Sequence, residues 1–304
     1  MKDPSIMNFR HFCLALSIAL VWGANFPVMK IGLNGISPLI FSGLRSLLIL
    51  PLLFFIPRPK ISWKVLLLIG LLIGTLTVPL LLLAIHLGVA AGLSSLIIQA
   101  QAFFTVLLAL LFFNQKPSFL NWMGMSIAFL GIGFIGIQVG GEASLLGLGI
   151  ALISAIVFAI SNLVLQQKGQ TVDMFSLMAW MNIVPPIPLF LLSSLIYGND
   201  QFFQSFQNFT WISGASLLYA SLVSGLFGYT TWGFLLKKYP AAVVTPFSLL
   251  VPVFAISFAY LTVDETLTTT SIYGCLLVIS GLIINQLKTG YLKFKNPPKM
   301  SPEP

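Results

Sequence analysis

The feature that most constrains this chain is a series of ten apolar stretches, each about as long as a bilayer is thick. A helix that crosses the hydrocarbon core needs about 20 mostly apolar residues. The connections between the stretches are short, and runs such as 66–83 do not alternate apolar with polar residues as strands of a membrane barrel do. The sequence therefore predicts an all-α, polytopic membrane protein with ten transmembrane helices. The predicted spans are 12–32, 38–56, 65–87, 92–113, 119–137, 146–165, 175–197, 211–236, 241–263 and 270–287.

The composition excludes the common classes of soluble protein. Charged residues make up only 7% of the 304 residues, hydrophobic residues make up 58%, and the mean hydropathy is +1.00. An ordinary soluble domain has roughly 25% charged residues, which cover its surface. A soluble enzyme, a nucleic-acid-binding protein and a disordered protein are therefore all excluded, and we expect the lipid bilayer as a partner. The two cysteines lie far apart, so we expect no metal site, and we expect no cofactor.

The basic residues predict the orientation in the membrane. All but two of the 15 Lys and Arg residues fall in the N-terminus, in the even-numbered loops between spans, or in the tail. The opposite loops hold acids and no basic residue. Basic residues mark the cytoplasmic side. We therefore expect residues 1–11 to be a cytoplasmic N-terminus and residues 288–304 to be a disordered, basic cytoplasmic tail.

The two halves of the chain resemble each other weakly. An offset of 150 residues aligns Gly124 with Gly274 and Gly131 with Gly281, while an offset of 136 aligns Ala15 with Ala151. The predicted repeats are 12–138 (helices 1–5) and 146–287 (helices 6–10). Because each repeat has an odd number of spans, the second must be inverted in the membrane, a common construction of secondary transporters with a site between the halves. The four glycines indicate helix-packing seams rather than sites.

Charged groups are scarce inside the predicted spans. Arg45 lies about 10 Å from the outer end of its span at 1.5 Å per residue. Two interpretations stay open, because the side chain could extend outward to the interface or could bind a substrate carboxylate in a bidentate way. His86, near the outer end of the third span, is the candidate proton-linked residue, with an interfacial role as the alternative. Since no acid lies clearly within a span, a neutral or zwitterionic solute fits better than a cation.

Uncharged polar residues follow helical stripes on several spans. Gln99 and Gln101 lie about 200° apart around their helix, so both cannot face one cavity. We expect one of them to line a pore and the other to bond a neighbouring helix. For each polar residue the alternative is a plain interhelical hydrogen bond, of about 0.6 kcal/mol. The other candidates to shape a substrate cavity are Asn25, Asn162, Tyr229, Trp232 and Ser248.

Several motifs resemble a known family. Val-Trp-Gly-Ala-Asn-Phe at 21–26 and Gly-Leu-Arg at 43–45 resemble the opening of EamA-domain proteins of the drug/metabolite transporter superfamily. Ala-Gly-Leu-Ser-Ser at 91–95, Tyr-Thr-Thr-Trp-Gly at 229–233 and the run 246–253 look like those of bacterial exporters of O-acetylserine and cysteine. The resemblance covers roughly residues 12–287. It implies a ten-helix transporter of the bacterial inner membrane, built from two inverted EamA repeats.

The leading hypothesis is a secondary transporter that exports small zwitterionic amino-acid metabolites by alternating access. Arg45 is the expected carboxylate ligand, and the polar and aromatic residues named above would shape the cavity. The alternative is an exporter of other uncharged or aromatic metabolites or drugs, for which Trp22, Trp180 and Trp232 would matter more. An intramembrane enzyme is disfavoured because the spans lack a cluster of catalytic groups. The oligomeric state stays open, a homodimer included.

Overall fold

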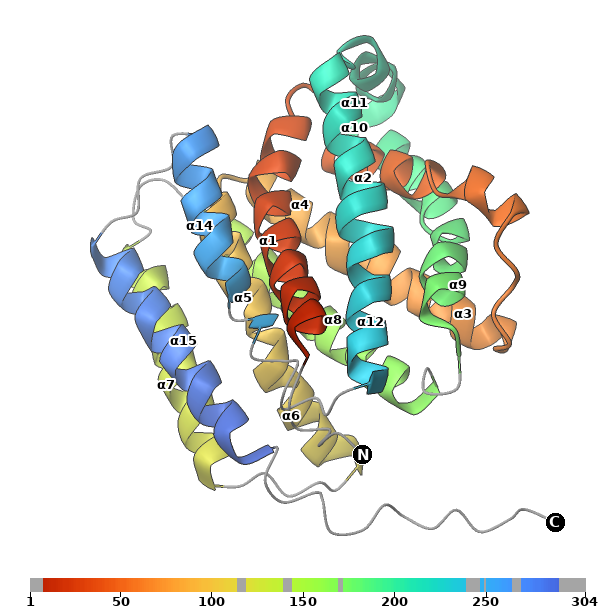
Figure 1. Cartoon of the computed structure of the whole chain (residues 1–304). Helices are drawn as coiled ribbons and strands as arrows, with labels where there is room; N and C mark the ends of the chain where they lie inside the picture. The colour runs from red at the N-terminus through yellow and green to blue at the C-terminus, as the bar shows by residue number, and fades with distance from the viewer. Residues whose placement is uncertain are drawn as a thin grey trace, which may run out of the picture.

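The computed structural model describes residues 8–113, 119–138, 144–168, 172–238, 247–248, 250–263 and 269–289. Within these ranges the chain is helical and forms no strand, which confirms the predicted all-α class. The two predicted terminal segments fall largely outside them. Figure 1 shows the helices gathered into one bundle, with α7 (Phe119–Gln138) and α15 (Thr269–Thr289) side by side at one edge.

Most of the predicted spans lie along one helix or along one broken run of helices. The unbroken members include α1 (Phe9–Gly32) and α8 (Leu145–Lys168). The remaining elements are α2 (Pro38–Leu47), η1 (Leu50–Phe54), α3 (Trp63–Ile69), η2 (Gly70–Thr77), α4 (Val78–His86), α5 (Ala91–Gln99), α6 (Gln101–Phe113), α9 (Met174–Trp180), η3 (Met181–Ile183), α10 (Pro186–Gln207), α11 (Trp211–Leu218), η4 (Tyr219–Gly228), α12 (Tyr229–Lys238) and α14 (Leu250–Thr262).

Among the described residues, five helical runs are long and apolar enough to cross a membrane. The five are Phe9–Gly32, Trp63–His86, Leu145–Leu165, Met174–Asp200 and Trp211–Leu235. The chain is therefore a multi-pass helical protein, while the count of ten spans stays a prediction.

Two of the long runs contain a π-helical segment at equivalent places. The segments are η2 and η4, about 150 residues apart in the chain, which is the offset that relates the two halves. In η2 the hydroxyls of Thr75 and Thr77 donate to the carbonyls of Gly70 and Leu72, each five residues earlier. π-helical segments are rare and occur often at functional sites. Here one of them, η4, forms a wall of the candidate site.

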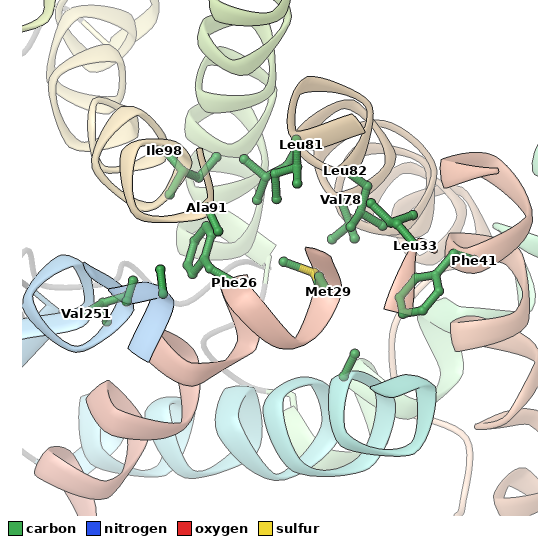
Figure 2. Close-up of a cluster of buried hydrophobic side chains, with 14 of the residues drawn as sticks. Phe26, Met29, Leu33, Phe41, Val78, Leu81, Leu82, Ala91, Ile98 and Val251 are labelled. Atoms are coloured by element: carbon green, nitrogen blue, oxygen red, sulfur yellow. The ribbon is translucent and has the colours of Figure 1, made fainter. Parts of the chain in front are cut away.

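The largest core cluster joins helices from both halves of the chain. Figure 2 shows Phe26 and Met29 of α1 among side chains from α2, α4, α5 and α14. Phe41 is fully buried in this cluster. Burying such a side chain contributes about 1.5–3 kcal/mol, so α1 is held in the middle of the bundle.

The pair α7 and α15 packs through the glycines that the sequence pointed to as seams. A Cβ on Gly131 would lie 2.7 Å from the carbonyl oxygen of Gly274, and one on Gly281 would lie 2.5 Å from that of Gly124. The two helices are therefore antiparallel, and the prediction of a packing seam is confirmed. An offset of 150 residues turns each of these contacts into the other. This reciprocity is what two inverted repeats related by a two-fold axis produce.

The seam predicts a stability difference between two glycine-to-alanine changes. In Gly281→Ala the new methyl meets the backbone of α7, so we expect a loss of about 1–3 kcal/mol from overpacking. In Gly149→Ala, on α8, the methyl meets nothing within 4 Å. That matched control should be neutral or gain up to about 1 kcal/mol of helix propensity. Thermal unfolding in detergent measures the stability of both variants. Equal melting temperatures would contradict the close packing of α7 against α15 at Gly281.

Candidate functional site

The candidate site is a small cavity around Arg45, on the last turn of α2. The Arg45 side chain is only 7% exposed. The cavity has a volume of about 10 Å³, which holds roughly one water molecule. Its walls come from α2 in the first half of the chain and from α9, η3, η4 and α12 in the second. The lining residues are Arg45, Ile49, Met178, Met181, Asn182, Ser221, Gly225, Leu226 and Tyr229.

No carboxylate in the described part of the chain pairs with Arg45. The acids there are Asp173 and Asp200, and neither lines the cavity. Asp173 instead caps α9, where its Oδ2 accepts from the backbone N–H of Ser176 at 2.8 Å. The hydroxyl of Ser221 donates to the backbone carbonyl of Arg45 at 2.8 Å, which joins η4 to α2. A buried cation is costly unless an anion compensates it. The cavity is therefore electrostatically suited to an anionic group.

Three aromatic side chains, Trp22, Tyr229 and Trp232, lie together beside the cavity and are called the aromatic group below. Tyr229 is the member that lines the cavity. The ring of Trp22, on α1, lies 5.2 Å from that of Tyr229 and 5.3 Å from that of Trp232. The indole N–H of Trp22 donates to the carbonyl of Ser224 at 3.0 Å. Rings at this spacing stabilise one another by about 0.5–1.5 kcal/mol beyond their burial. Of the predicted residues, the structure thus brings together Arg45, Tyr229 and Trp232, the last by way of Trp22.

Close approach of η4 to Trp22 requires a glycine at position 228. A Cβ there would lie 2.5 Å from Nε1 of Trp22. Gly228→Ala should therefore displace the indole from Ser224 and from Tyr229, and we expect about tenfold weaker substrate affinity in a proteoliposome flux assay. Gly214→Ala is the matched control, because its methyl would make only ordinary contact, at 3.4 Å, with Phe209. Equal substrate affinities in Gly228→Ala and Gly214→Ala would contradict the assignment of the aromatic group to the site.

The two glutamines do not divide their roles as the sequence suggested. The side-chain amide of Gln99 donates to the backbone carbonyl of Ser248 at 2.9 Å, and Asn162 donates to the side-chain oxygen of Gln101. Each glutamine thus bonds a neighbouring helical segment, and neither lines the cavity beside Arg45. In this structure the side chains of Gln99, Gln101 and Asn162 make the interhelical hydrogen bonds that the second alternative describes, and the backbone of Ser248 accepts one of them. The physical reason is that the helix is interrupted at Ala100, so Gln99 ends α5 and Gln101 begins α6, and each finds a polar partner on a different neighbour.

Asn25 and His86 lie apart from the cavity. The amide of Asn25 donates to the sulfur of Met29 at 3.4 Å, while its buried oxygen has no hydrogen-bond partner among the described residues. Asn25 is nearly one turn along α1 from Trp22, so it belongs to the same region of the bundle. His86 ends α4 and is exposed.

The residues that the sequence analysis missed are Asn182 and Ser221. Asn182 lies in the 3-10 turn η3, in the middle of a predicted span and just before Pro185 and Pro186. A polar residue beside two helix-breaking prolines is a usable signal, because a broken helix inside a membrane is tolerated where it lines a cavity. Ser221 carried no such signal in the sequence.

Comparison with known proteins gives the family. The model of the EamA-like transporter family matches residues 10–137 and again 145–286. The chain belongs to this family. The two matches are the two EamA repeats, and the resemblance seen in the sequence motifs is confirmed.

Relatives of this EamA protein carry names that describe export. The chain is 38% identical over 290 residues to a "Probable amino-acid metabolite efflux pump" of Salmonella typhimurium, covering 92% of this chain and 95% of the relative. It is 36% identical to a protein of the same name in Escherichia coli, with the same coverage. Family and relatives make this chain a transporter rather than an enzyme. A solved crystal structure matches 94% of this chain and 99% of its own length, with a TM-score of 0.60 and 13% identity, and so shares the fold.

Proposed function

We propose that this EamA protein is a secondary transporter of the bacterial inner membrane that exports small zwitterionic amino-acid metabolites, similar to cysteine and O-acetylserine, by alternating access. The observation that carries the proposal is Arg45, a buried cation without a carboxylate partner among the described residues, in a cavity walled by both repeats. The relatives named amino-acid metabolite efflux pumps support the substrate class. The distribution of basic residues supports cytoplasmic N- and C-termini.

In this proposal Arg45 binds the substrate carboxylate. Its planar guanidinium can donate two parallel hydrogen bonds to the two carboxylate oxygens. Tyr229 lines the same cavity and stands between it and Trp22, so the substrate side chain would lie toward the aromatic group. Asn25, whose buried oxygen has no partner in the described part of the chain, is the further polar group that we assign to the path. Gln99, Ser248, Gln101 and Asn162 would hold the surrounding helices in place through their hydrogen bonds.

The size and the walls of the cavity support the proposal of alternating access. A space for about one water cannot hold an amino acid, so the walls must separate when substrate binds. Ile49, Met178 and Leu226 close the cavity on the side of a second core cluster, which also contains Ile69 and Ile73. Two of the walls, η3 and η4, are not α-helical. They offer the places where hydrogen bonding can shift while the adjoining helices stay intact.

The aromatic group favours a second candidate substrate class. Trp22, Tyr229 and Trp232 present three rings next to the cavity, which suits an aromatic metabolite or drug. Arg45 distinguishes the two candidates, because a compound without a carboxylate cannot accept two parallel charge-assisted hydrogen bonds from its guanidinium.

Radiolabelled flux into proteoliposomes tests the proposed function. Cysteine, O-acetylserine and phenylalanine are compared with and without a pH gradient. We expect saturable flux of the first two. Since no carboxylate relay lies within the described spans, we expect flux without a pH gradient as well. Flux of phenylalanine alone would favour the aromatic alternative, and no flux of any of the three would overturn the substrate assignment.

A further inference from the structure

Asn182 stands in the wall of the cavity with its amide group in a fixed orientation. It is 7% exposed and lies in η3, where the α-helical pattern is interrupted. Its side-chain nitrogen donates to the carbonyl of Met178 at 2.7 Å and is 3.4 Å from that of Ala179. Because a carbonyl can only accept, the nitrogen of the amide must be the atom that faces these two oxygens.

This orientation leaves the side-chain oxygen of Asn182 as a hydrogen-bond acceptor. The oxygen lies on the other branch of the amide, directed away from the carbonyls of α9. None of the described residues donates a hydrogen bond to it. Asn182 and Arg45 both line the cavity, so a residue with a cationic donor from the first repeat and one with a neutral acceptor from the second border the same small space.

We propose that the oxygen of Asn182 accepts a hydrogen bond from the ammonium group of the substrate, so that the cavity selects amino acids over acids that lack the amino group. This assignment rests on the proposed function and adds a second ligand to it. The carboxylate and the ammonium of an α-amino acid are attached to one carbon atom, and Arg45 and Asn182 match them in kind. A zwitterion bound in this way connects the two repeats.

The neutral amide suits this role better than a carboxylate would. An acid at position 182 would form an ion pair with Arg45 and would occupy the donors that the substrate carboxylate needs. An asparagine supplies an acceptor for an ammonium group and leaves the guanidinium free of a fixed anion. A hydrophobic residue at this position would leave the guanidinium free of a fixed anion but would supply no acceptor.

The competing explanation is that Asn182 only stabilises the break in the helix. Its bonds to the carbonyls of Met178 and Ala179 tie η3 to the last turn of α9, where the α-helical pattern ends. A purely structural role predicts that a variant loses folded protein or loses transport of every substrate equally. A role in recognition predicts a change in selectivity, which is independent of the amount of folded protein.

The test compares cysteine with 3-mercaptopropionate, which has the same skeleton without the amino group. Competition against radiolabelled cysteine flux is measured in proteoliposomes of the wild type, Asn182→Leu and the smaller Asn182→Ala. We expect the wild type to prefer cysteine by about tenfold or more, because a hydrogen bond to a charged group is lost in the analogue. In both variants this preference should fall toward one, through weaker binding of cysteine and unchanged binding of 3-mercaptopropionate. Asn208→Leu, outside the cavity, should keep the wild-type preference.

The failures of the two proposals are distinguishable. A wild type that carries no amino acid overturns the proposed function, and the role of Asn182 with it. A wild type that carries cysteine without discriminating against 3-mercaptopropionate overturns only the Asn182 assignment, whether or not the variants can be reconstituted. A preference that stays unchanged in Asn182→Leu or Asn182→Ala does the same.

Discussion

Arg45→Gln is expected to reduce cysteine flux by about 100-fold or more without loss of folded protein. Removing one partner of a buried, hydrogen-bonded charge pair costs about 2–5 kcal/mol of binding, and each 1.4 kcal/mol is a factor of ten. Glutamine keeps a polar, hydrogen-bonding side chain, but it is shorter than arginine and carries no charge. In the unliganded protein it removes a buried cation that has no carboxylate partner in the described chain, so the free energy of unfolding should stay the same or rise.

Flux and folding are measured on the same reconstituted samples. Arg45→Lys should fall between the wild type and Arg45→Gln, because an ammonium keeps the charge but cannot bind a carboxylate through two parallel bonds. Arg58→Gln is the matched control. Arg58 is exposed, lies 4.0 Å over the ring of Trp63 and donates to the carbonyl of Ile61 at 3.2 Å. Normal cysteine flux in Arg45→Gln would show that the substrate carboxylate is bound elsewhere.

Gly23→Leu is expected to abolish the folded protein. Gly23 lies where α1 packs against α14, which joins the first repeat to the second. A Cβ at this position would lie 2.4 Å from Cβ of Phe254, 2.9 Å from the backbone nitrogen of Ala255 and 3.0 Å from the carbonyl oxygen of Val251. Because two of these atoms are backbone, relief requires the helices to separate. We expect a loss of about 3 kcal/mol or more, the upper end of overpacking costs.

The measurement is the fraction of monodisperse protein after extraction in mild detergent. Gly149→Leu is the control, since the space around Gly149 is open. It should give the wild-type fraction. Equal monodisperse fractions for Gly23→Leu and Gly149→Leu would mean that α1 and α14 do not approach as closely as the structure places them.

Much of the fold could be predicted from the sequence because the bilayer imposes it. A helix that crosses a membrane must be long and apolar, so span positions can be read directly from hydropathy. The seam between α7 and α15 was also predictable, because Gly124, Gly131, Gly274 and Gly281 recur seven residues apart. The π-helical segments η2 and η4 were not. The residues of η2 are apolar or small, like those of an ordinary span, and the change in hydrogen bonding depends on packing against η3 and Pro185.

The candidate site was predictable where a residue was chemically unusual for its surroundings. Arg45 could be found because it is charged and lies deep within a predicted span. Tyr229 and Trp232 could be found because their spacing places them on one helical face. Asn182 and Gln99 are both buried amides in spans, yet only Asn182 lines the cavity. Which amide faces the cavity and which bonds a neighbour depends on tertiary packing, which hydropathy and helical period do not specify.

The most direct test of the account measures the interaction between Arg45 and the substrate carboxylate itself. Equilibrium binding of cysteine and of cysteamine, which lacks the carboxylate, is measured for the wild type and for Arg45→Gln. The account predicts that the wild type binds cysteine at least about tenfold more tightly than cysteamine, and that this preference disappears in the variant. A variant that keeps the wild-type preference would contradict the assignment of Arg45 as the carboxylate ligand.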